Sequence, residues 1–508
     1  MLAMVASATL VGLDATIIHV EVDVSPHGLP YTKIVGLPAR VVQESKERVR
    51  SAIRNSGVIL SPRKTTVNLS PAALPKQQSF FDLPIALGIL QGHGKIPIVP
   101  GRTIVVGELS LDGSLVRIRG ALAIALRAKV EHFTEIVLPA ANAQELGTID
   151  GVKVRPANSL REVIDFLTGN RGLFYRPIET EASSASKSEF EKAIFPRGNL
   201  IAKRAIQISL AGNHHLLLYG APGTGKTMIA SSVPHLLQPL DPQEQSEVTL
   251  IQTAAGKLRG KAAVLPPFRA PHHSLGEQEL LGGGALHTPG EITLAHRGYL
   301  FLDEFSEYGS RSLNALRQPL ERGSITLDYR GSVFTYPSRF TLIAATNLCP
   351  CGHFGSRLKN CTCSASEISR YRKKISGPLL DRIDMQIQMD EFNSSEALYD
   401  HIDSTFVEMI THAKQAQRLR YKNAHLKSNG ELSAASAQTY CTLDTTAKTL
   451  LKLGANRLGL SMRKYVIVIR VAQTIADLAA SKTIKKRHIA EALQLCRNLS
   501  FQTGEQKA

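Results

Sequence analysis

Short apolar runs recur along the chain, and the spacing of their apolar positions changes from one part of the sequence to the next. Over residues 1–170, runs with the period of two that is typical of strands are interspersed with runs of helical periodicity. The predicted strands are Thr16–Val24, Thr65–Leu69, Thr103–Val106 and Ile136–Leu138. The predicted helices are Val41–Arg54, Leu83–Leu90 and Leu122–Ala128. This order predicts a first domain that mixes α and β structure.

A domain boundary is predicted at residues 171–190, which contain a small, polar run without periodicity that is typical of a linker. From 191 to 392, strands and helices alternate as a parallel sheet requires. From 393 to 508 the strand signal almost disappears and helical periodicity is strong, as in Tyr465–Ala480 and Lys486–Cys496. The chain is therefore predicted to be a multidomain α/β protein with a helical C-terminal domain.

An eight-residue phosphate-binding motif follows one of the predicted strands of the second domain. In order, its residues are Gly220, Ala221, Pro222, Gly223, Thr224, Gly225, Lys226 and Thr227. The apolar run His215–Tyr219 before it predicts a buried strand, and Met228–Ala230 begin a helix after it. Such a loop places backbone N–H groups around a phosphate chain, with Lys226 reaching the β- and γ-phosphates and Thr227 ligating Mg²⁺. The chain is therefore predicted to bind and hydrolyse a nucleoside triphosphate.

Two further apolar runs in the second domain end in polar side chains suited to the same reaction. Gly298–Leu302 is followed by Asp303, which would hold Mg²⁺ through water, and by Glu304, which would polarise the attacking water. Phe340–Thr346 is followed by Asn347, which would position that water or sense the γ-phosphate. Polar residues at strand ends are also common solvated termini, and the phosphate loop is what favours the catalytic interpretation here.

The length and composition describe an ordinary globular protein. The 508 residues exceed what one core accommodates and predict about three domains. A hydrophobic content of 43% and a charged content of 20% are typical of soluble proteins, and no apolar run reaches the about 18 residues of a membrane-spanning helix. The apolar N-terminus has no basic residue before it, so we expect a mature N-terminus and a cytoplasmic protein.

The charge balance is strongly basic. Lys and Arg number 60 against 43 Asp and Glu, which gives a net charge of +17. This balance favours a polyanionic partner, most simply nucleic acid, over an acidic protein or a membrane surface. A soluble protein that is merely basic is the alternative.

Four of the six cysteines are clustered in residues 349–363. Cys349 and Cys351 form one close pair, and Cys361 and Cys363 form a second. Two close pairs of thiolates match a tetrahedral Zn²⁺ site, which would hold together a loop too polar to fold alone. A structural zinc ion is therefore our prediction. Reduced free thiols or a redox pair are the alternative.

The order phosphate loop, Leu-Asp-Glu and Ala-Thr-Asn resembles an AAA+ ATPase, and Gly377–Asp384 and Leu460–Arg463 resemble later elements of that family. By that likeness, Arg382 would be an arginine finger directed at the γ-phosphate of ATP in a neighbouring subunit. Arg463 would be a second sensor of the nucleotide in its own chain. An ion pair is the alternative role for each arginine. A finger that acts between subunits implies a homo-oligomeric ring, which we expect to be a hexamer.

The long interval between Lys226 and Asp303 resembles the insertions of the magnesium-chelatase-like branch of AAA+ proteins, in which an extra element projects into the central pore. It contains His272 and His273. We interpret these two as loop or packing residues, because adjacent histidines in a loop rarely chelate one ion.

A β-hairpin is predicted around Asp328–Gly331, where two β-patterned runs flank a turn. By the same resemblance this hairpin would face the pore. Tyr329 and Arg330 at its tip are then predicted to contact DNA, since a ring would repeat them around a strand. An ordinary exposed turn is the alternative.

Motifs spread over the whole chain resemble the ComM (YifB) group of magnesium-chelatase-like AAA+ ATPases. They are the four-cysteine segment, the run that ends at Asp384, and Val35–Pro38, Val67–Pro75, Phe81–Gly88 and Val106–Gly113. The resemblance implies a Lon-protease-like α+β N-terminal domain, a three-layer αβα ATPase core and an α-helical lid. It also implies a helicase that binds single-stranded or branched DNA and drives branch migration of recombination intermediates in homologous recombination during natural transformation.

Two other functions are open at this point. A chelatase-type protein-remodelling motor is the main rival, and the basic charge, the cysteine loop and the Lon-like domain argue against it. An ATP-dependent peptidase would need a Ser-Lys dyad, but Arg119–Ile124 has no Lys where the base should stand. Ser79 is then an unactivated hydroxyl. We expect the N-terminal domain to be non-catalytic, with a structural, assembly or DNA-binding role.

Overall fold

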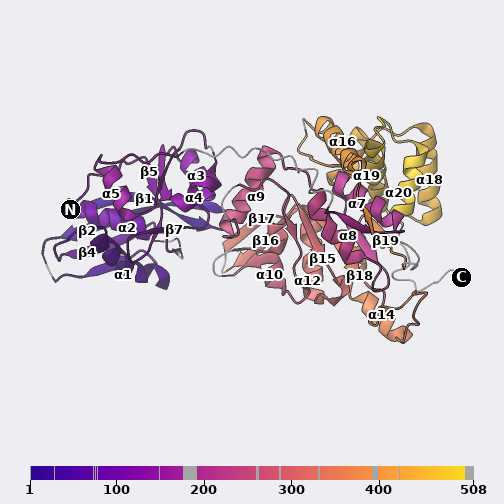
Figure 1. Cartoon of the computed structure of the whole chain (residues 1–508), viewed down its shortest axis with the longest axis horizontal. Helices are drawn as coiled ribbons and strands as arrows, with labels where there is room; N and C mark the ends of the chain where they lie inside the picture. Colours follow the sequence, from indigo (N-terminus) through magenta and orange to yellow (C-terminus); the bar gives the residue numbers. More distant parts are fainter. Residues whose placement is uncertain are drawn as a thin grey trace.

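The computed structural model describes residues 2–27, 29–72, 74, 76, 78–147, 149–175, 192–258, 262–284, 288–329, 332–391, 399–422 and 424–497. The N-terminal domain, the nucleotide-binding core and the helical C-terminal domain lie in a row (Figure 1). Most of the predicted linker lies outside the described residues. The mixed α/β class predicted from the sequence is confirmed.

A seven-stranded mixed sheet forms the N-terminal domain, in the order β3-β4-β2-β1-β5-β8-β9. Its strands are β1 (Leu2–Val11), β2 (Asp14–Ser25), β3 (Thr32–Val35), β4 (Lys64–Ser70), β5 (Thr103–Val105), β8 (Glu135–Pro139) and β9 (Lys153–Ala157). A small hairpin, β6 (Glu108–Leu109) and β7 (Leu115–Val116), accompanies it. The helices are α1 (Arg40–Asn55), α2 (Asp82–Gly92), α3 (Ala121–Val130), α4 (Ala140–Leu146) and α5 (Leu160–Leu167). Every residue of α2 is buried, as expected of a helix that is apolar on all sides.

Five parallel strands form the sheet of the core, in the order β12-β15-β18-β11-β19. They are β11 (Leu216–Tyr219), β12 (Phe268–Arg269), β15 (Tyr299–Leu302), β18 (Thr341–Thr346) and β19 (Met385–Gln388). The main helices are α7 (Leu200–Gly212), α8 (Lys226–Ser232), α9 (Pro242–Ala254), α10 (Glu277–Leu281), α11 (Glu291–Leu294), α12 (Ser310–Ala315), α13 (Arg317–Arg322), α14 (Ala365–Lys373) and α15 (Gly377–Leu380).

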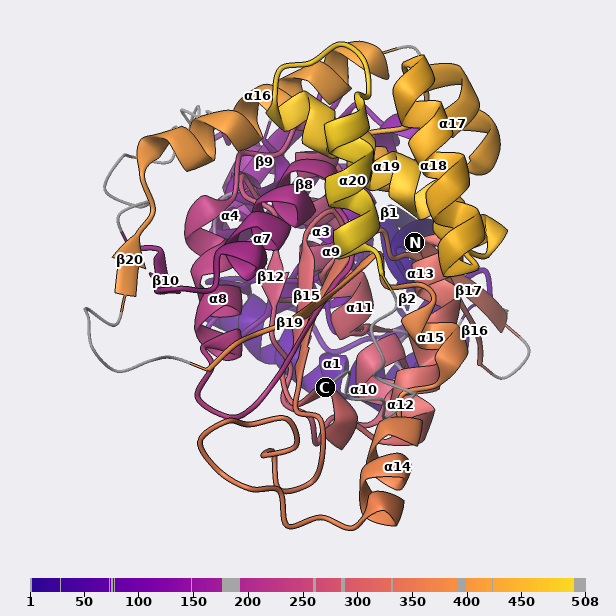
Figure 2. The ribbon, with the colours of Figure 1, turned by 90° about the vertical axis from the view of Figure 1, so that its right-hand side faces the viewer.

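Alternate residues of β11 belong to two separate apolar clusters. Leu216 and Leu218 pack with α7, α8 and the C-terminal helices, whereas Leu217 and Tyr219 pack with α11, α12 and α15. Both faces of the sheet are therefore covered, which explains why this strand is a continuous apolar run in the sequence. The result is the three-layer αβα arrangement that was predicted (Figure 2).

The C-terminal part is helical, with α16 (Ser404–Arg420), α17 (Ala434–Tyr440), α18 (Thr445–Leu458), α19 (Met462–Leu478) and α20 (Lys486–Leu495). It includes one short strand, β20 (Tyr399–His401), which pairs in antiparallel fashion with β10 (Ile194–Pro196) at the start of the core. The lid helices share one apolar cluster with α7 and α8, so the lid and the core have a continuous interior.

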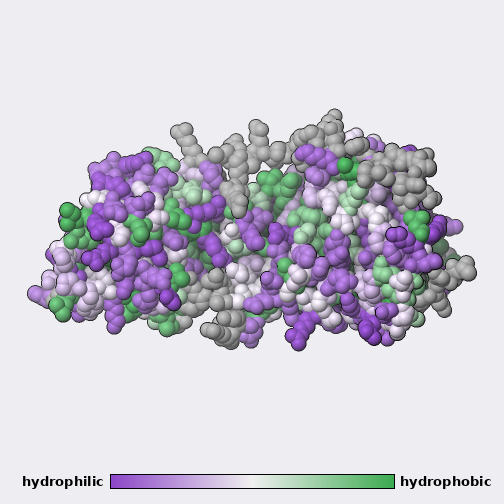
Figure 3. Space-filling model, turned by 60° about the horizontal axis from the view of Figure 1, so that its bottom comes forward, coloured by the Kyte–Doolittle hydropathy of each residue, from purple (hydrophilic) through white to green (hydrophobic). Residues whose placement is uncertain are grey.

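The surface is largely polar, with hydrophobic side chains scattered in small groups on the face that Figure 3 presents. Within the described ranges, no helix has the length and hydropathy needed to cross a membrane.

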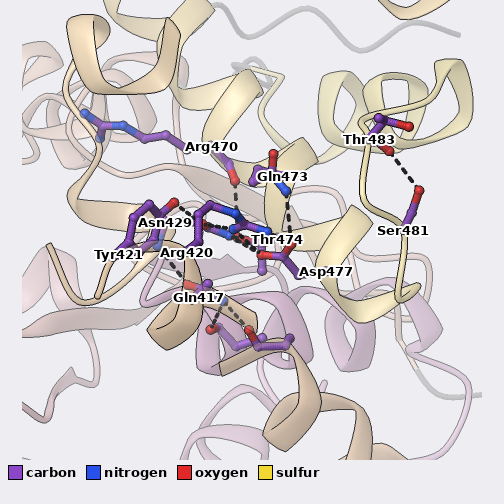
Figure 4. A network of polar contacts seen from close by, with 12 residues as sticks. Gln417, Arg420, Tyr421, Asn429, Arg470, Gln473, Thr474, Asp477, Ser481 and Thr483 are labelled. Atoms are coloured by element: carbon purple, nitrogen blue, oxygen red, sulfur yellow. Dashed lines mark hydrogen bonds and ion pairs between the residues drawn. The ribbon is translucent and has the colours of Figure 1, made fainter. Parts of the chain in front are cut away.

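A buried polar network joins the lid to the core (Figure 4). Asp477 on α19 accepts hydrogen bonds from Arg420 at 2.9 Å and from Asn429 at 2.9 Å. Asn429 also donates to Thr474 at 2.8 Å, and the Thr474 hydroxyl lies 2.7 Å from Nε2 of His214, just before β11. Because the members of such a network satisfy one another, we infer that it holds the lid in one position against the core.

We expect Asp477→Ala to lower the free energy of unfolding by about 3 kcal/mol, because it removes a buried carboxylate and leaves the half-buried Arg420 charge without its partner. Glu491→Ala is the matched control. It breaks the 2.8 Å pair of Glu491 with Arg204, whose side chains are 32% and 30% exposed, and should cost at most about 1 kcal/mol. Urea denaturation followed by circular dichroism measures both. Equal stability of Asp477→Ala and the wild type would contradict the assignment.

Candidate nucleotide site

The phosphate loop connects the carboxyl end of β11 to the start of α8, and glycines allow its tight path. Gly225 has a φ of +87°, a region that L side chains rarely adopt, and a Cβ there would lie 2.5 Å from Cγ of Pro196. A Cβ at Gly220 would lie 2.7 Å from the carbonyl oxygen of Met389. These two positions therefore require glycine for steric reasons.

Lys226 begins α8, and its side chain folds back onto the loop. Its Nζ donates to the carbonyl oxygens of Gly220 at 2.9 Å and of Ala221 at 2.7 Å. Burial lowers the pKa of Lys226 to about 8. A phosphate entering the loop would replace these neutral acceptors with charged oxygens, and hydrogen bonds to charged groups are the stronger ones.

The two predicted Mg²⁺ ligands touch each other. The Thr227 hydroxyl donates to Oδ2 of Asp303 at 2.8 Å, and Oδ1 of Asp303 accepts the backbone N–H of Glu304 at 2.9 Å. They meet because α8 follows the carboxyl end of β11 and Asp303 follows the carboxyl end of β15. A hydroxyl and a carboxylate oxygen are ligands that Mg²⁺ takes beside nucleotide phosphates, so the pair fits this ion.

Glu304 has a partner that sequence reasoning missed. His273 belongs to the loop that follows β12, and its Nδ1 lies 3.0 Å from Oε2 of Glu304. The sequence predicted loop or packing roles for both histidines, and this description suits His272, whose ring packs against that of His273 in a tilted arrangement with 4.1 Å between the centroids. His273 instead contacts the carboxylate expected to polarise water. The contact depends on the pairing of β12 with β15, which no local pattern indicates.

Asn347 is brought to the same edge of the sheet. It follows Thr346, which pairs with Tyr219 in the register of β18 and β11. The carbonyl oxygen of Thr346 also accepts the N–H of Gly220 at 3.3 Å. The side chain of Asn347 therefore begins beside the phosphate loop, one strand away from Asp303.

The four clustered cysteines form a compact group directly after Asn347. The Sγ atom of Cys349 lies 3.4 Å from that of Cys351 and 3.6 Å from that of Cys361, and all four ligand atoms including Cys363 lie within 4.8 Å of one another. Four sulfurs around one zinc ion would lie about 3.8 Å apart, given Zn–S bonds of about 2.3 Å. Backbone N–H groups donate to the sulfurs, as from Phe354 to Cys349 at 3.2 Å. The group fits a Zn²⁺ site.

The cysteine loop rests on the phosphate loop. A Cβ at Gly352 would lie 2.5 Å from Cγ of Pro222 and 3.8 Å from Nδ2 of Asn347. Whatever holds the cysteine loop in shape therefore also supports one wall of the nucleotide site.

The two predicted arginines lie together, but on a different part of the core. Arg382 donates to Glu321 at 2.6 Å and to the carbonyl oxygen of Pro378 at 2.5 Å, and Arg463 lies 3.8 Å from the other oxygen of Glu321. The hydrogen bond from Arg382 lowers the pKa of Glu321. Among the described residues, neither arginine forms a hydrogen bond or an ion pair with the phosphate loop. Glu321 had no sequence signal, since its role depends on where α13 packs.

The predicted hairpin is present as β16 (Ser324–Tyr329) and β17 (Ser332–Pro337), paired in antiparallel register. Arg330 and the side chain of Tyr329 lie outside the described residues. Their contact with DNA stays a prediction.

The candidate hydroxyl of the N-terminal domain is engaged elsewhere. The Ser79 hydroxyl hydrogen-bonds to the Glu108 carboxylate. The amine of the fully buried Lys76 donates to the carbonyl oxygens of Gly36, at 2.9 Å, and Pro71. Within the described residues, no lysine amine has a recorded contact with Ser79.

Three models of magnesium chelatase match the chain in succession. The model of magnesium chelatase subunit ChlI matches residues 195–397, that of subunit ChlI of Mg-chelatase matches 20–142, and that of the subunit ChlI C-terminal region matches 403–496.

Similar proteins extend over nearly the whole chain. The uncharacterized protein YifB of Escherichia coli is 37% identical over 97% of this chain and 96% of its own length. The competence protein ComM of Haemophilus influenzae is 36% identical over 97% of both chains. A shorter match, 28% identical over 41% of this chain, covers 21% of the DNA helicase MCM8 of Gallus gallus.

Proposed function

The chain belongs to the magnesium-chelatase-like family of AAA+ ATPases that includes the YifB and ComM proteins, and from this we propose that it is a ring-forming motor that uses ATP hydrolysis to move along DNA. The contact of Thr227 with Asp303 beside the phosphate loop is the observation that most supports ATP hydrolysis. The net charge of +17 and the names of the relatives, a competence protein and a DNA helicase, favour the DNA part.

Different residues at the carboxyl edge of the sheet would bind the phosphates, hold Mg²⁺, polarise the attacking water and sense the γ-phosphate. Lys226 and the loop N–H groups would bind the phosphates, while Thr227 and Asp303 would hold Mg²⁺, which neutralises charge on the β- and γ-phosphates when it is bound. Glu304 would orient and polarise the attacking water, and its contact with His273 keeps the carboxylate directed at this edge. Asn347 would sense the γ-phosphate from the neighbouring strand.

We propose that Arg382 and Arg463 both serve the nucleotide of the adjacent subunit. The resemblance alone assigned Arg463 to the nucleotide of its own chain. The geometry favours the shared role, because both guanidinium groups meet at Glu321, and Arg463 lines a cavity with His215 and Thr341 near the amino ends of strands. The phosphate loop lies at the opposite, carboxyl ends.

We expect DNA to stimulate the ATPase several-fold, because a translocating motor couples turnover to its track. Phosphate release is measured with single-stranded DNA, duplex DNA, a casein-like protein or no addition, at low and high salt. Stimulation by DNA that weakens with salt supports the proposal. Stimulation by the protein alone would favour the chelatase-type remodelling motor, which is the second candidate because of the ChlI matches. Branch migration of a four-way DNA junction then tests the recombination role.

We also propose that Cys349, Cys351, Cys361 and Cys363 hold one structural zinc ion. Elemental analysis of purified protein should find about one zinc per chain and almost none in Cys351→Ser. Cys441→Ser is the matched control, because Cys441 is buried in the lid away from the cluster and should leave the zinc in place. Wild-type protein without zinc would rule the site out.

The N-terminal domain is proposed to be a non-catalytic assembly module. Ser79 pairs with the Glu108 carboxylate rather than with the lysine amine that a Ser-Lys dyad requires. The domain also docks on the core, where Thr253 of α9 accepts the N–H of Gly120 at 2.9 Å and Ala254 accepts a hydrogen bond from Arg119 at 3.0 Å.

A further inference from the structure

A second concave site lies between the core and the lid, on the side of the sheet away from the phosphate loop. The cavity has a volume of about 360 Å³. Its walls include His215 just before β11, Gly298 just before β15 and Thr341 at the start of β18. These residues mark the amino ends of the parallel strands, whereas nucleotide phosphates would enter at the carboxyl ends.

The cavity is positively charged. Seven Arg and Lys side chains line it against three Glu among the described residues. Arg297 is paired with Glu247 at 2.7 Å and with Glu431 at 3.6 Å, and Arg463 is paired with Glu321 at 3.8 Å. The remaining lining cations include Arg322, Arg339 and Arg418, whose side chains have no recorded ion pair or hydrogen bond with the described residues. An unneutralised positive charge is therefore concentrated in a concave space, which favours an anion.

Lys414 on α16 is the cation of this cavity that most clearly lacks a partner. Lys414 is half-buried and lines the cavity, and its amine makes no hydrogen bond or ion pair with the described residues. Burial lowers its pKa to about 8. Glu244 is the acidic group that acts on it, and Arg418 opposes that effect. A half-buried ammonium without a partner has lost part of its hydration, so an anion in the cavity would stabilise it.

The wall also contains polar groups without partners. The hydroxyls of Ser338 and Ser428, the amide nitrogen of Gln238 and Nε of Arg470 are buried and make no hydrogen bond among the described residues. In Figure 4 the Arg470 side chain extends away from the Arg420–Asp477 pair. Buried polar groups normally find partners, so the residues around the cavity keep hydrogen-bonding capacity that the described residues do not use.

We propose that this cavity binds a phosphate group, on a nucleic-acid backbone or on a free polyphosphate, at a site separate from the phosphate loop of its own chain. Guanidinium and ammonium donors are the side chains that recognise phosphate oxygens. Arg322 and Arg339 flank the base of the β16–β17 hairpin, so the cavity adjoins the hairpin whose tip is predicted to contact DNA. The proposal uses neither Lys226 nor Arg382, and it does not depend on ATP hydrolysis.

The test uses full-length protein with Lys226→Ala, which disables the phosphate loop. Isothermal titration with inorganic pyrophosphate should detect a remaining site, and adding Lys414→Ala should weaken it by about tenfold or more, as loss of a charged hydrogen bond does. Lys414→Arg should keep the binding. Lys452→Ala, which removes an exposed cation of the lid outside the cavity, should change nothing.

Fluorescence anisotropy with a labelled single-stranded oligonucleotide identifies the source of the phosphate. Competition by pyrophosphate and a parallel loss of affinity in Lys414→Ala indicate a nucleic-acid backbone. Unchanged DNA affinity beside lost pyrophosphate binding indicates a free polyphosphate. Equal pyrophosphate binding with and without Lys414, or binding of polyglutamate in place of pyrophosphate, would overturn the proposal. The DNA-stimulated ATPase assay is independent of each of these outcomes.

Discussion

Replacement of Glu304 by Gln is expected to stop ATP hydrolysis while ATP remains bound. The carboxylate follows β15 next to Asp303, and an amide of the same shape accepts no proton from the attacking water. The turnover number should fall by about 10²–10⁴-fold, the usual contribution of a general base. Phosphate release measures turnover, and a fluorescent ATP analogue measures binding. The contact of Thr227 with Asp303 is untouched by the change, so Mg²⁺ and phosphate binding should persist.

Glu307→Gln is the matched control for this prediction. Glu307 lies three residues further along, and its carboxylate pairs with Lys374 at 3.4 Å at a position that is 41% exposed. Its loss should leave turnover close to the wild-type value. Hydrolysis by Glu304→Gln at the wild-type rate would remove Glu304 from the catalytic role.

Two inactive variants, Lys226→Ala and Arg382→Ala, are expected to restore activity when mixed. Each alone should lose nearly all turnover, since an arginine finger contributes about 10³-fold or more and the loop lysine binds the phosphates. In a mixed ring, an Arg382→Ala subunit keeps its phosphate loop, and a Lys226→Ala neighbour keeps its finger. When the two variants assemble at random, about one interface in four joins the phosphate loop of an Arg382→Ala subunit to the finger of a Lys226→Ala neighbour. About a quarter of the wild-type activity should therefore return.

The structural reason is the separation of the two groups within one chain. Arg382 is held by Glu321, and it has no recorded contact with the phosphate loop in the described part of the chain. A mixture that stays inactive, although the subunits exchange, would place Arg382 on its own nucleotide. The same mixture with Arg463→Ala in place of Arg382→Ala decides between the two assignments of Arg463. Recovery of ATPase activity indicates that Arg463 acts on the nucleotide of the neighbouring subunit. No recovery indicates that it acts on the nucleotide of its own chain.

The local sequence predicted much of the nucleotide site. The Gly-rich loop, the Asp-Glu pair and Asn347 each follow a short apolar run, and such runs flanked by polar signals mark strands of a parallel sheet. Parallel strands have their carboxyl ends at one edge, so the meeting of Thr227 with Asp303 follows from that arrangement. The contact of His273 with Glu304 could not be predicted from the sequence, because β12 has only two residues and no recognisable pattern.

The sequence by itself determined the alternation of strands and helices in the core, the helical C-terminal domain and the residues available for phosphate chemistry, because glycine geometry and apolar periodicity act over a few neighbouring residues. The tertiary structure alone decided which distant side chains share a partner. It placed Arg382 and Arg463, 81 positions apart, on one carboxylate of α13, and it gathered Lys414 with Arg322 and Arg339 around one cavity. Such groupings depend on how the lid packs on the core, and that packing is specified by buried surfaces and by the Asp477 network rather than by any local motif.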